Sequence, residues 1–198
     1  MNNTQKSPLQ EAVEQAHAKG RRAVIPFITA GFPDMDSFWT HLERIDAAGA
    51  DIIEIGVPFS DPVADGPVIE DASRDALARG VSLKWILDGL KARKGQFSAK
   101  LALMGYVNPF YQYGLENLAR DAAEAGVYGF IVPDMPLEES GMFRKVFAPY
   151  GLTLVTLVAP NTSVERMKEY KPCTEGFVYV VSVLGTTGGK TDLEQSVA

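Results

Sequence analysis

The chain has 198 residues, of which 46% are apolar and 22% charged, and this composition is typical of one globular domain with a full hydrophobic core. Its formal net charge is −6 and its basic residues run no longer than a pair, as at Arg21-Arg22, which argues against nucleic acid or anionic lipid as a partner. One cysteine and two histidines exclude an internal disulfide and make a zinc site hard to build, so we expect no metal and a reducing, cytoplasmic location.

The N-terminal segment predicts an amphipathic helix. This leader is expected at about residues 4–19, with Leu9, Val13 and Ala16 on one face, where they could plug the bottom of a barrel. No apolar stretch approaches the ~18 residues that cross a bilayer, so we expect no membrane span.

Six short apolar runs predict strands, and helix-patterned segments lie between them. The strands are expected at residues 23–28, 51–56, 100–104, 127–132, 152–158 and 177–181, and the helices at 35–48, 85–90, 115–125, 137–147 and 164–170. Because strands joined by helical crossovers run parallel, the fold is α/β, with a parallel sheet covered on both faces or closed into a barrel.

The chain is short for this pattern. An eight-unit barrel normally needs about 250 residues, whereas only six strand–helix units can be counted, and no linker or second domain interrupts them. We therefore expect residues 1–198 to form a single barrel domain that is truncated at its C-terminus. Because six strands leave open edges, we expect the chain alone to be poorly active and prone to association.

The second predicted strand carries a carboxylate among isoleucines. Strand alternation places Ile53 and Ile55 on one face and Glu54 on the other, beside Gly56, which leaves space. If the isoleucines pack on helices, Glu54 faces the barrel interior. A solvated or ion-paired glutamate is an equally good interpretation, but a buried carboxylate is tolerated mainly where a raised pKa serves proton transfer.

A long loop with three prolines follows this strand and contains Asp65. Asp65 lies eleven residues after Glu54 in the sequence and could return over the strand end, which would place a second carboxylate in the same pocket. An ordinary turn aspartate ahead of Gly66 is about as good an interpretation from the local sequence.

Residues 54–67, with the sequence EIGVPFSDPVADGP, resemble the signature of the tryptophan synthase alpha chain family. The resemblance continues through PF at 26–27, MGYVNP at 104–109, VPDMPLEES at 132–140, APNT at 159–162 and YVVS at 179–182. It implies a (βα)8 TIM barrel that cleaves indole-3-glycerol phosphate to indole and glyceraldehyde 3-phosphate. It also implies no cofactor in this chain and a partner beta chain that carries pyridoxal phosphate, in an α2β2 assembly.

The resemblance also implies roles for individual residues. Glu54 matches the acid–base glutamate and Asp65 the second catalytic carboxylate. The positions expected to bind substrate are Phe27, Met104 and Tyr179 around the indole, each of which would also serve as barrel core, and Thr187 and Gly188 in a lid and at the phosphate. The positions expected to face the beta chain are Pro58, Asp61, Asn108, Asp134 and Pro136.

Two alternatives remain for the function. Gly189-Lys190-Thr191 imitates the end of a P-loop, which would indicate a nucleotide hydrolase, but Leu184 stands where the first glycine of that motif belongs. The second alternative is an inactive, truncated barrel that retains only a partner-docking surface, because the phosphate cradle of the family lies mainly after strands seven and eight. Thr186 departs from the valine usual in the family, which puts the packing of the lid in doubt.

Overall fold

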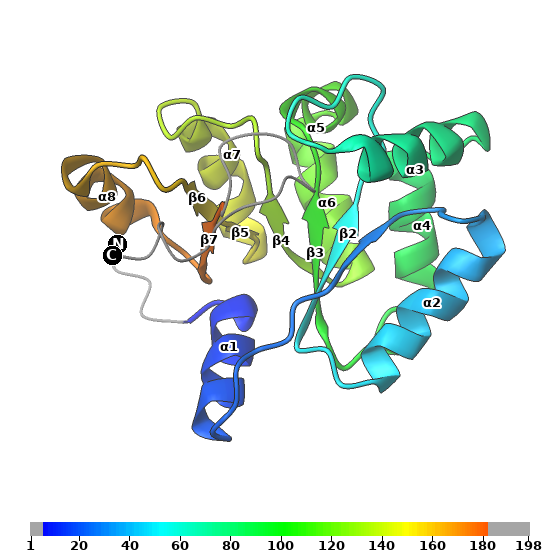
Figure 1. The fold of residues 1–198 in the computed structure, drawn as a ribbon, viewed down its shortest axis with the longest axis horizontal. Coiled ribbons are helices and arrows are strands. Elements are labelled where there is room, and N and C mark those ends of the chain that lie inside the picture. The colour runs from blue at the N-terminus through cyan, green and yellow to red at the C-terminus, as the bar shows by residue number, and fades with distance from the viewer. Residues whose placement is uncertain (1–5, 182–198) are drawn as a thin grey trace.

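A computed structural model describes residues 6–181, and its centre is a parallel sheet (Figure 1). The strands hydrogen-bond in chain order: β1 (Phe27–Thr29), β2 (Ile52–Gly56), β3 (Lys100–Met104), β4 (Val127–Ile131) and β5 (Thr153–Leu154). A second parallel pair joins β6 (Thr156–Val158) to β7 (Val178–Val180). The predicted parallel α/β architecture is confirmed.

The fifth predicted strand is divided in two at Val155. Before this residue the chain pairs with β4, the Val155 N–H itself donates to the Phe130 carbonyl at 2.9 Å, and after it the chain pairs with β7. The Arg144 guanidinium spans the division, because it donates to the Leu154 carbonyl at 3.0 Å and to Thr156 Oγ1 at 3.3 Å. The expected single strand at 152–158 is therefore wrong, since its two halves pair with different neighbours.

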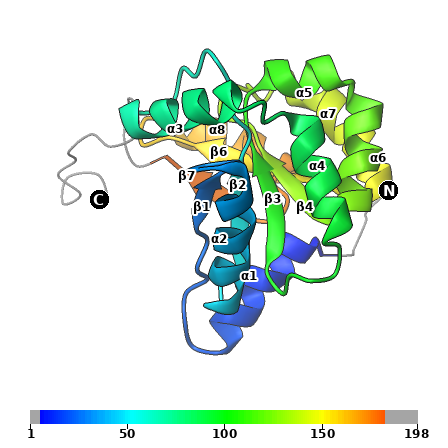
Figure 2. The same ribbon diagram turned by 90° about the vertical axis from the view of Figure 1, so that its right-hand side faces the viewer.

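Helices surround the sheet, most of them on its outer face (Figures 1 and 2). The helices of the described residues are α1 (Pro8–Ala18), α2 (Met35–Ala47), α3 (Pro67–Ala78), α4 (Leu83–Ala92), α5 (Val107–Tyr113), α6 (Leu115–Ala125), α7 (Ser140–Phe147) and α8 (Val164–Tyr170), with 3-10 turns η1 (Ala148–Tyr150) and η2 (Lys171–Cys173). The side chains of Ser7, Asp34, Ser82 and Ser163 accept N–H groups in the first turns of α1, α2, α4 and α8, which satisfies donors that a helix start leaves without partners. The structure adds α3 and α5 to the predicted helices.

Helix α1 closes one end of the sheet. Leu9 and Ala12 are buried against Ile52, Ala102 and Ile131, which lie on the concave face. Figures 1 and 2 place α1 at the end of the strands opposite α3 and α5. The α3 and α5 end is therefore where the strands finish and where a site is expected in a barrel.

The convex face carries the larger apolar core. Ile53 and Ile55 are fully buried among residues of the surrounding helices. Three aromatic rings continue this core, with Phe130 lying edge-on to Phe110 at 5.3 Å and stacked on Phe147 at 4.5 Å between ring centroids. This packing fixes which face of each strand points toward the helices and which points toward the concave side.

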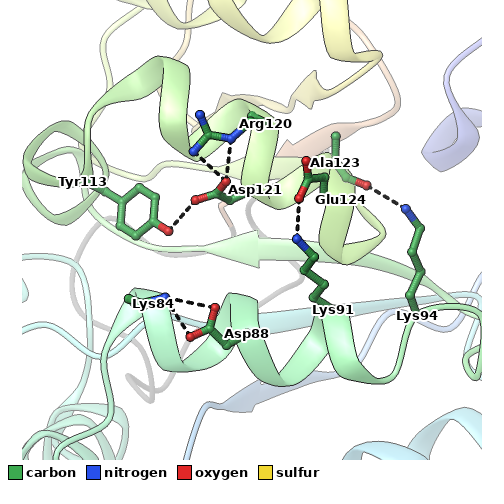
Figure 3. A network of polar contacts seen from close by, with 9 residues as sticks. All are labelled: Lys84, Asp88, Lys91, Lys94, Tyr113, Arg120, Asp121, Ala123 and Glu124. Carbon is green, nitrogen blue, oxygen red and sulfur yellow. Dashed lines mark hydrogen bonds and ion pairs between the residues drawn. The ribbon is translucent and has the colours of Figure 1, made fainter.

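Polar contacts line the surface between α4 and α6 (Figure 3). Lys91 pairs with Glu124 across the two helices, and the Tyr113 hydroxyl donates to Asp121 at 2.7 Å. Exposed ion pairs contribute little to stability, because solvent screens them. The apolar contacts beneath them therefore hold these helices in place.

Candidate active site

Glu54 lies in the middle of β2 and faces the inside of the sheet. Its neighbours in the ladder are Phe27 on β1 and Ala102 on β3, and Ala102 belongs to the interior cluster that α1 covers. Ile53 and Ile55 point the other way, into the helices. Alternation along the strand thus carries the carboxylate into the interior.

The Glu54 carboxyl is buried, with only 5% of the residue exposed. Burial raises the pKa of this carboxyl from its ordinary value of 4.5 to about 7, because a low-dielectric surrounding penalises the charged form. A group with such a pKa holds its proton about half the time at neutral pH. It is therefore able both to donate and to accept a proton there.

A pocket opens at the ends of β1, β2 and β3 and is lined by Gly56, two residues after Glu54 on β2, and by Phe27, which pairs with Glu54. It brings together three residues expected in the site, Asp65, Phe27 and Met104. A Cβ at Gly56 would lie 2.5 Å from Phe27 Cζ. The expectation that Gly56 leaves open space is therefore wrong, since the ring of Phe27 fills that space and forms a wall of the pocket.

Asp65 reaches this pocket from the loop between β2 and α3. Burial raises the pKa of its carboxyl, while a hydrogen bond from the Tyr106 hydroxyl acts in the opposite direction, and the nearby charge of Glu70 raises it again. The same hydroxyl accepts the Ala64 N–H at 3.0 Å. Tyr106 was given no role in the sequence analysis, although it lies within the MGYVNP motif, and it is the principal residue of the site that sequence reasoning missed.

Tyr179 faces the interior from β7. It is half-buried and packs on the apolar cluster that contains Ala102 and Ile131. Burial raises the pKa of its hydroxyl, and the negative charge of Glu54 raises it further. The two side chains therefore share one interior space.

The residues expected at a partner interface lie in the segments after β2, β3 and β4, which also contribute lining residues to the pocket. Asp61, Asn108, Asp134 and Pro136 are exposed, whereas Pro58 is buried at the base of its loop. Asp134 accepts the Val107 N–H at 3.0 Å, which ties the loop after β4 to the start of α5. Thr187 and Gly188 lie outside the described residues, as does the segment that imitates a P-loop.

Neither a metal site nor a membrane helix is found in residues 6–181. No group of three or more His, Cys, Asp or Glu side chains there is placed to hold a metal ion. In that part of the chain no helix has the length and apolar character required to cross a bilayer.

Sequence comparison connects this arrangement to known proteins. A family profile described as "Tryptophan synthase alpha chain" matches residues 13–198. The tryptophan synthase alpha chain of Nitratidesulfovibrio vulgaris is 57% identical over 192 residues, which are 97% of this chain and 75% of that protein. The alpha chain of Desulfovibrio desulfuricans is 59% identical over 190 residues, 96% of this chain and 74% of that protein.

Solved structures agree with the sequence relatives. The alpha subunit from Legionella pneumophila str. Paris superposes with a TM-score of 0.85 at 36% identity, over 90% of this chain and 68% of that one. A structure of Mycobacterium tuberculosis tryptophan synthase gives a TM-score of 0.88 at 33% identity, over 96% and 73%. These neighbours are TIM barrels, and none of the comparisons indicates a nucleotide hydrolase or an inactive scaffold. The chain therefore belongs to the tryptophan synthase alpha chain family, the lyases that cleave indole-3-glycerol phosphate in tryptophan biosynthesis.

Proposed function

We propose that this chain cleaves indole-3-glycerol phosphate with Glu54 as its general acid and base. The observation that supports this role is a buried carboxyl with a pKa of about 7, which lies on β2 two residues before Gly56 and beside Phe27, both of which line a pocket at the strand ends. We also propose that residues 1–198 belong to one barrel domain of a cytoplasmic biosynthetic enzyme.

The reaction is a retro-aldol cleavage that needs two proton movements. One proton is placed on the indole ring carbon that bears the glycerol chain, and one is removed from the glycerol hydroxyl as the carbon–carbon bond breaks. The bonding electrons return to the ring, the hydroxyl carbon becomes the aldehyde of glyceraldehyde 3-phosphate, and indole is released. Glu54 is suited to both movements because its carboxyl can hold or release a proton near neutral pH.

Asp65 has a different part in this scheme. Protonation of the ring carbon places positive charge on the ring N–H, and a fixed carboxylate beside it stabilises that charge. Phe27, Met104 and Tyr179 supply the apolar surface around the indole. Thr187 and Gly188 are proposed, on the family resemblance, for the lid and the phosphate side.

Asp65→Asn is expected to lower kcat about 10- to 100-fold, which is less than the loss expected from removing the proton-transferring Glu54. The amide keeps the size of the side chain but removes the charge that stabilises the transition state. Release of glyceraldehyde 3-phosphate measures the effect, with Asp71→Asn, on the exposed surface of α3, as a matched control. A loss as complete as that of Glu54→Gln would contradict this division of roles.

The partner of the alpha chain in this family is a beta chain, which carries the pyridoxal phosphate, and the alpha chain itself carries no cofactor. We propose that the beta chain docks on the rim formed by Asp61, Asn108, Asp134 and Pro136, with the buried Pro58 supporting the loop. This rim includes the loop that carries Asp65, so docking could order the site and raise its activity.

Asp61→Lys is expected to weaken the complex about tenfold, because it reverses a charge on the proposed rim. Sedimentation measures the complex, and titration with the beta chain while indole production is followed measures its effect on rate. Glu11→Lys makes the same charge change on α1, at the opposite end of the strands, and should leave both unchanged. Equal effects of the two variants would place the docking surface elsewhere.

A further inference from the structure

We infer that Tyr106 is a positioning residue, whose hydroxyl holds the Ala64-Asp65 segment over the strand ends and so gives the Asp65 carboxylate a fixed place in the pocket. The inference rests on the proposed role of Asp65. It identifies the contact that holds Asp65, a loop residue, in a fixed position.

Tyr106 is well placed to act as an anchor because it is itself held firmly. The residue is 4% exposed and lies between the end of β3 and the start of α5. The next residue, Val107, donates its N–H to both carboxylate oxygens of Asp134, at 3.0 and 3.3 Å. The ring also packs against Phe59, with 5.3 Å between centroids.

The hydroxyl contacts the loop directly. It accepts the Ala64 N–H at 3.0 Å, and its proximity lowers the pKa of the Asp65 carboxyl against the effect of burial. A phenolic hydroxyl has one donor and can also accept, so the hydroxyl that accepts from the Ala64 backbone still has its proton to direct toward the neighbouring carboxylate. The contact joins residues 42 positions apart in the sequence.

The loop needs such an anchor between its ends. At its start the Val57 N–H donates to the Met104 carbonyl at 2.7 Å, and its other end leads into α3 at Pro67. Between these ends the loop is exposed to solvent, and Val63 is 75% exposed. Glu70 on α3 also places a like charge near Asp65, which would push the carboxylate away if the hydroxyl did not hold it.

Tyr106→Phe tests the inference, because it keeps the ring and removes only the hydroxyl. We expect kcat for indole release to fall about 10- to 100-fold, with KM changed less than about threefold, since a misplaced charge acts mainly on the transition state. Tyr113→Phe is the matched control. Tyr113 lies on α5, and its hydroxyl also donates to a carboxylate, that of Asp121 at 2.7 Å (Figure 3), so it should lose comparable stability and keep its kcat.

The double variant Tyr106→Phe with Asp65→Asn separates a positioning effect from a general one. If the hydroxyl acts through Asp65, adding Tyr106→Phe to the Asp65→Asn variant lowers kcat by less than about twofold further. Independent losses that multiply would overturn the inference, as would an unchanged kcat in Tyr106→Phe. If Asp65→Asn alone keeps full activity, the proposed role of Asp65 is wrong, and so is the inference about Tyr106. If only the inference is wrong, Asp65→Asn still lowers kcat. All rates are measured well below the unfolding midpoint of each variant.

Discussion

Glu54→Gln is expected to lower kcat for cleavage of indole-3-glycerol phosphate by about 10³-fold or more, with the fold unchanged. The amide has nearly the size of the carboxyl but cannot exchange a proton at neutral pH. General acid–base catalysis contributes typically ~10² to 10⁴-fold, and here one carboxyl serves both proton movements. Indole release measures the activity, and circular dichroism with thermal unfolding measures the fold.

Glu116→Gln is the control for this variant, because Glu116 is an exposed glutamate on α6. It should retain the activity of the unsubstituted chain. Near-normal turnover by Glu54→Gln would remove Glu54 from the mechanism, whatever the position of Asp65.

The stability of the chain is expected to fall as the pH rises from about 4.5 to about 7, and Glu54→Gln should remove part of that dependence. In the folded state the Glu54 pKa is about 7 against an ordinary 4.5, so between these values the folded chain binds more protons than the unfolded chain. The stabilisation is then fully present below pH 4.5 and lost as the pH rises through 7. Each pKa unit corresponds to about 1.4 kcal/mol, which gives a loss of about 3 kcal/mol at pH 8.

Urea unfolding at pH 5 and pH 8 measures this effect in both proteins. The difference in unfolding free energy between Glu54→Gln and the unsubstituted chain should shift in favour of the variant by about 2.5 kcal/mol between these pH values, because part of the effect is already lost at pH 5. Burial also raises the pKa values of Asp65 and Asp134, but their contributions are common to both proteins and cancel in the difference. Parallel pH curves would show that the Glu54 carboxyl is not desolvated.

The interior position of Glu54 was predictable because it depends only on local alternation. Neighbouring isoleucines must pack on something apolar, so a glutamate between them points the other way. The same reasoning applied to α1, where three- and four-residue spacing identified the face of Leu9 that is buried. Periodicity assigns faces well because it follows from backbone geometry alone.

The contacts that complete the site could not be found in this way. The bond from the Ala64 N–H to the Tyr106 hydroxyl, and the proximity of that hydroxyl to Asp65, join loops whose courses depend on the packing of α3 and α5. Helix α5 was missed because its seven residues include an internal proline, three aromatic side chains and two amide side chains, without a helical apolar period. The division at Val155 was missed because a continuous apolar run does not specify which neighbour each half pairs with.

The contact between Phe27 on β1 and Gly56 on β2 means that residues on both strands together determine the width of the pocket. The ring on β1 lies where a side chain on β2 would otherwise be, since a Cβ at Gly56 would stand 2.5 and 2.8 Å from two of its carbons. Volume added at position 56 must therefore be compensated by volume removed at position 27, and these positions are expected to vary together. Paired substitutions at positions 27 and 56, which lie diagonally across β1 and β2, provide a way to alter the size of the aromatic group that the site accepts without changing Glu54.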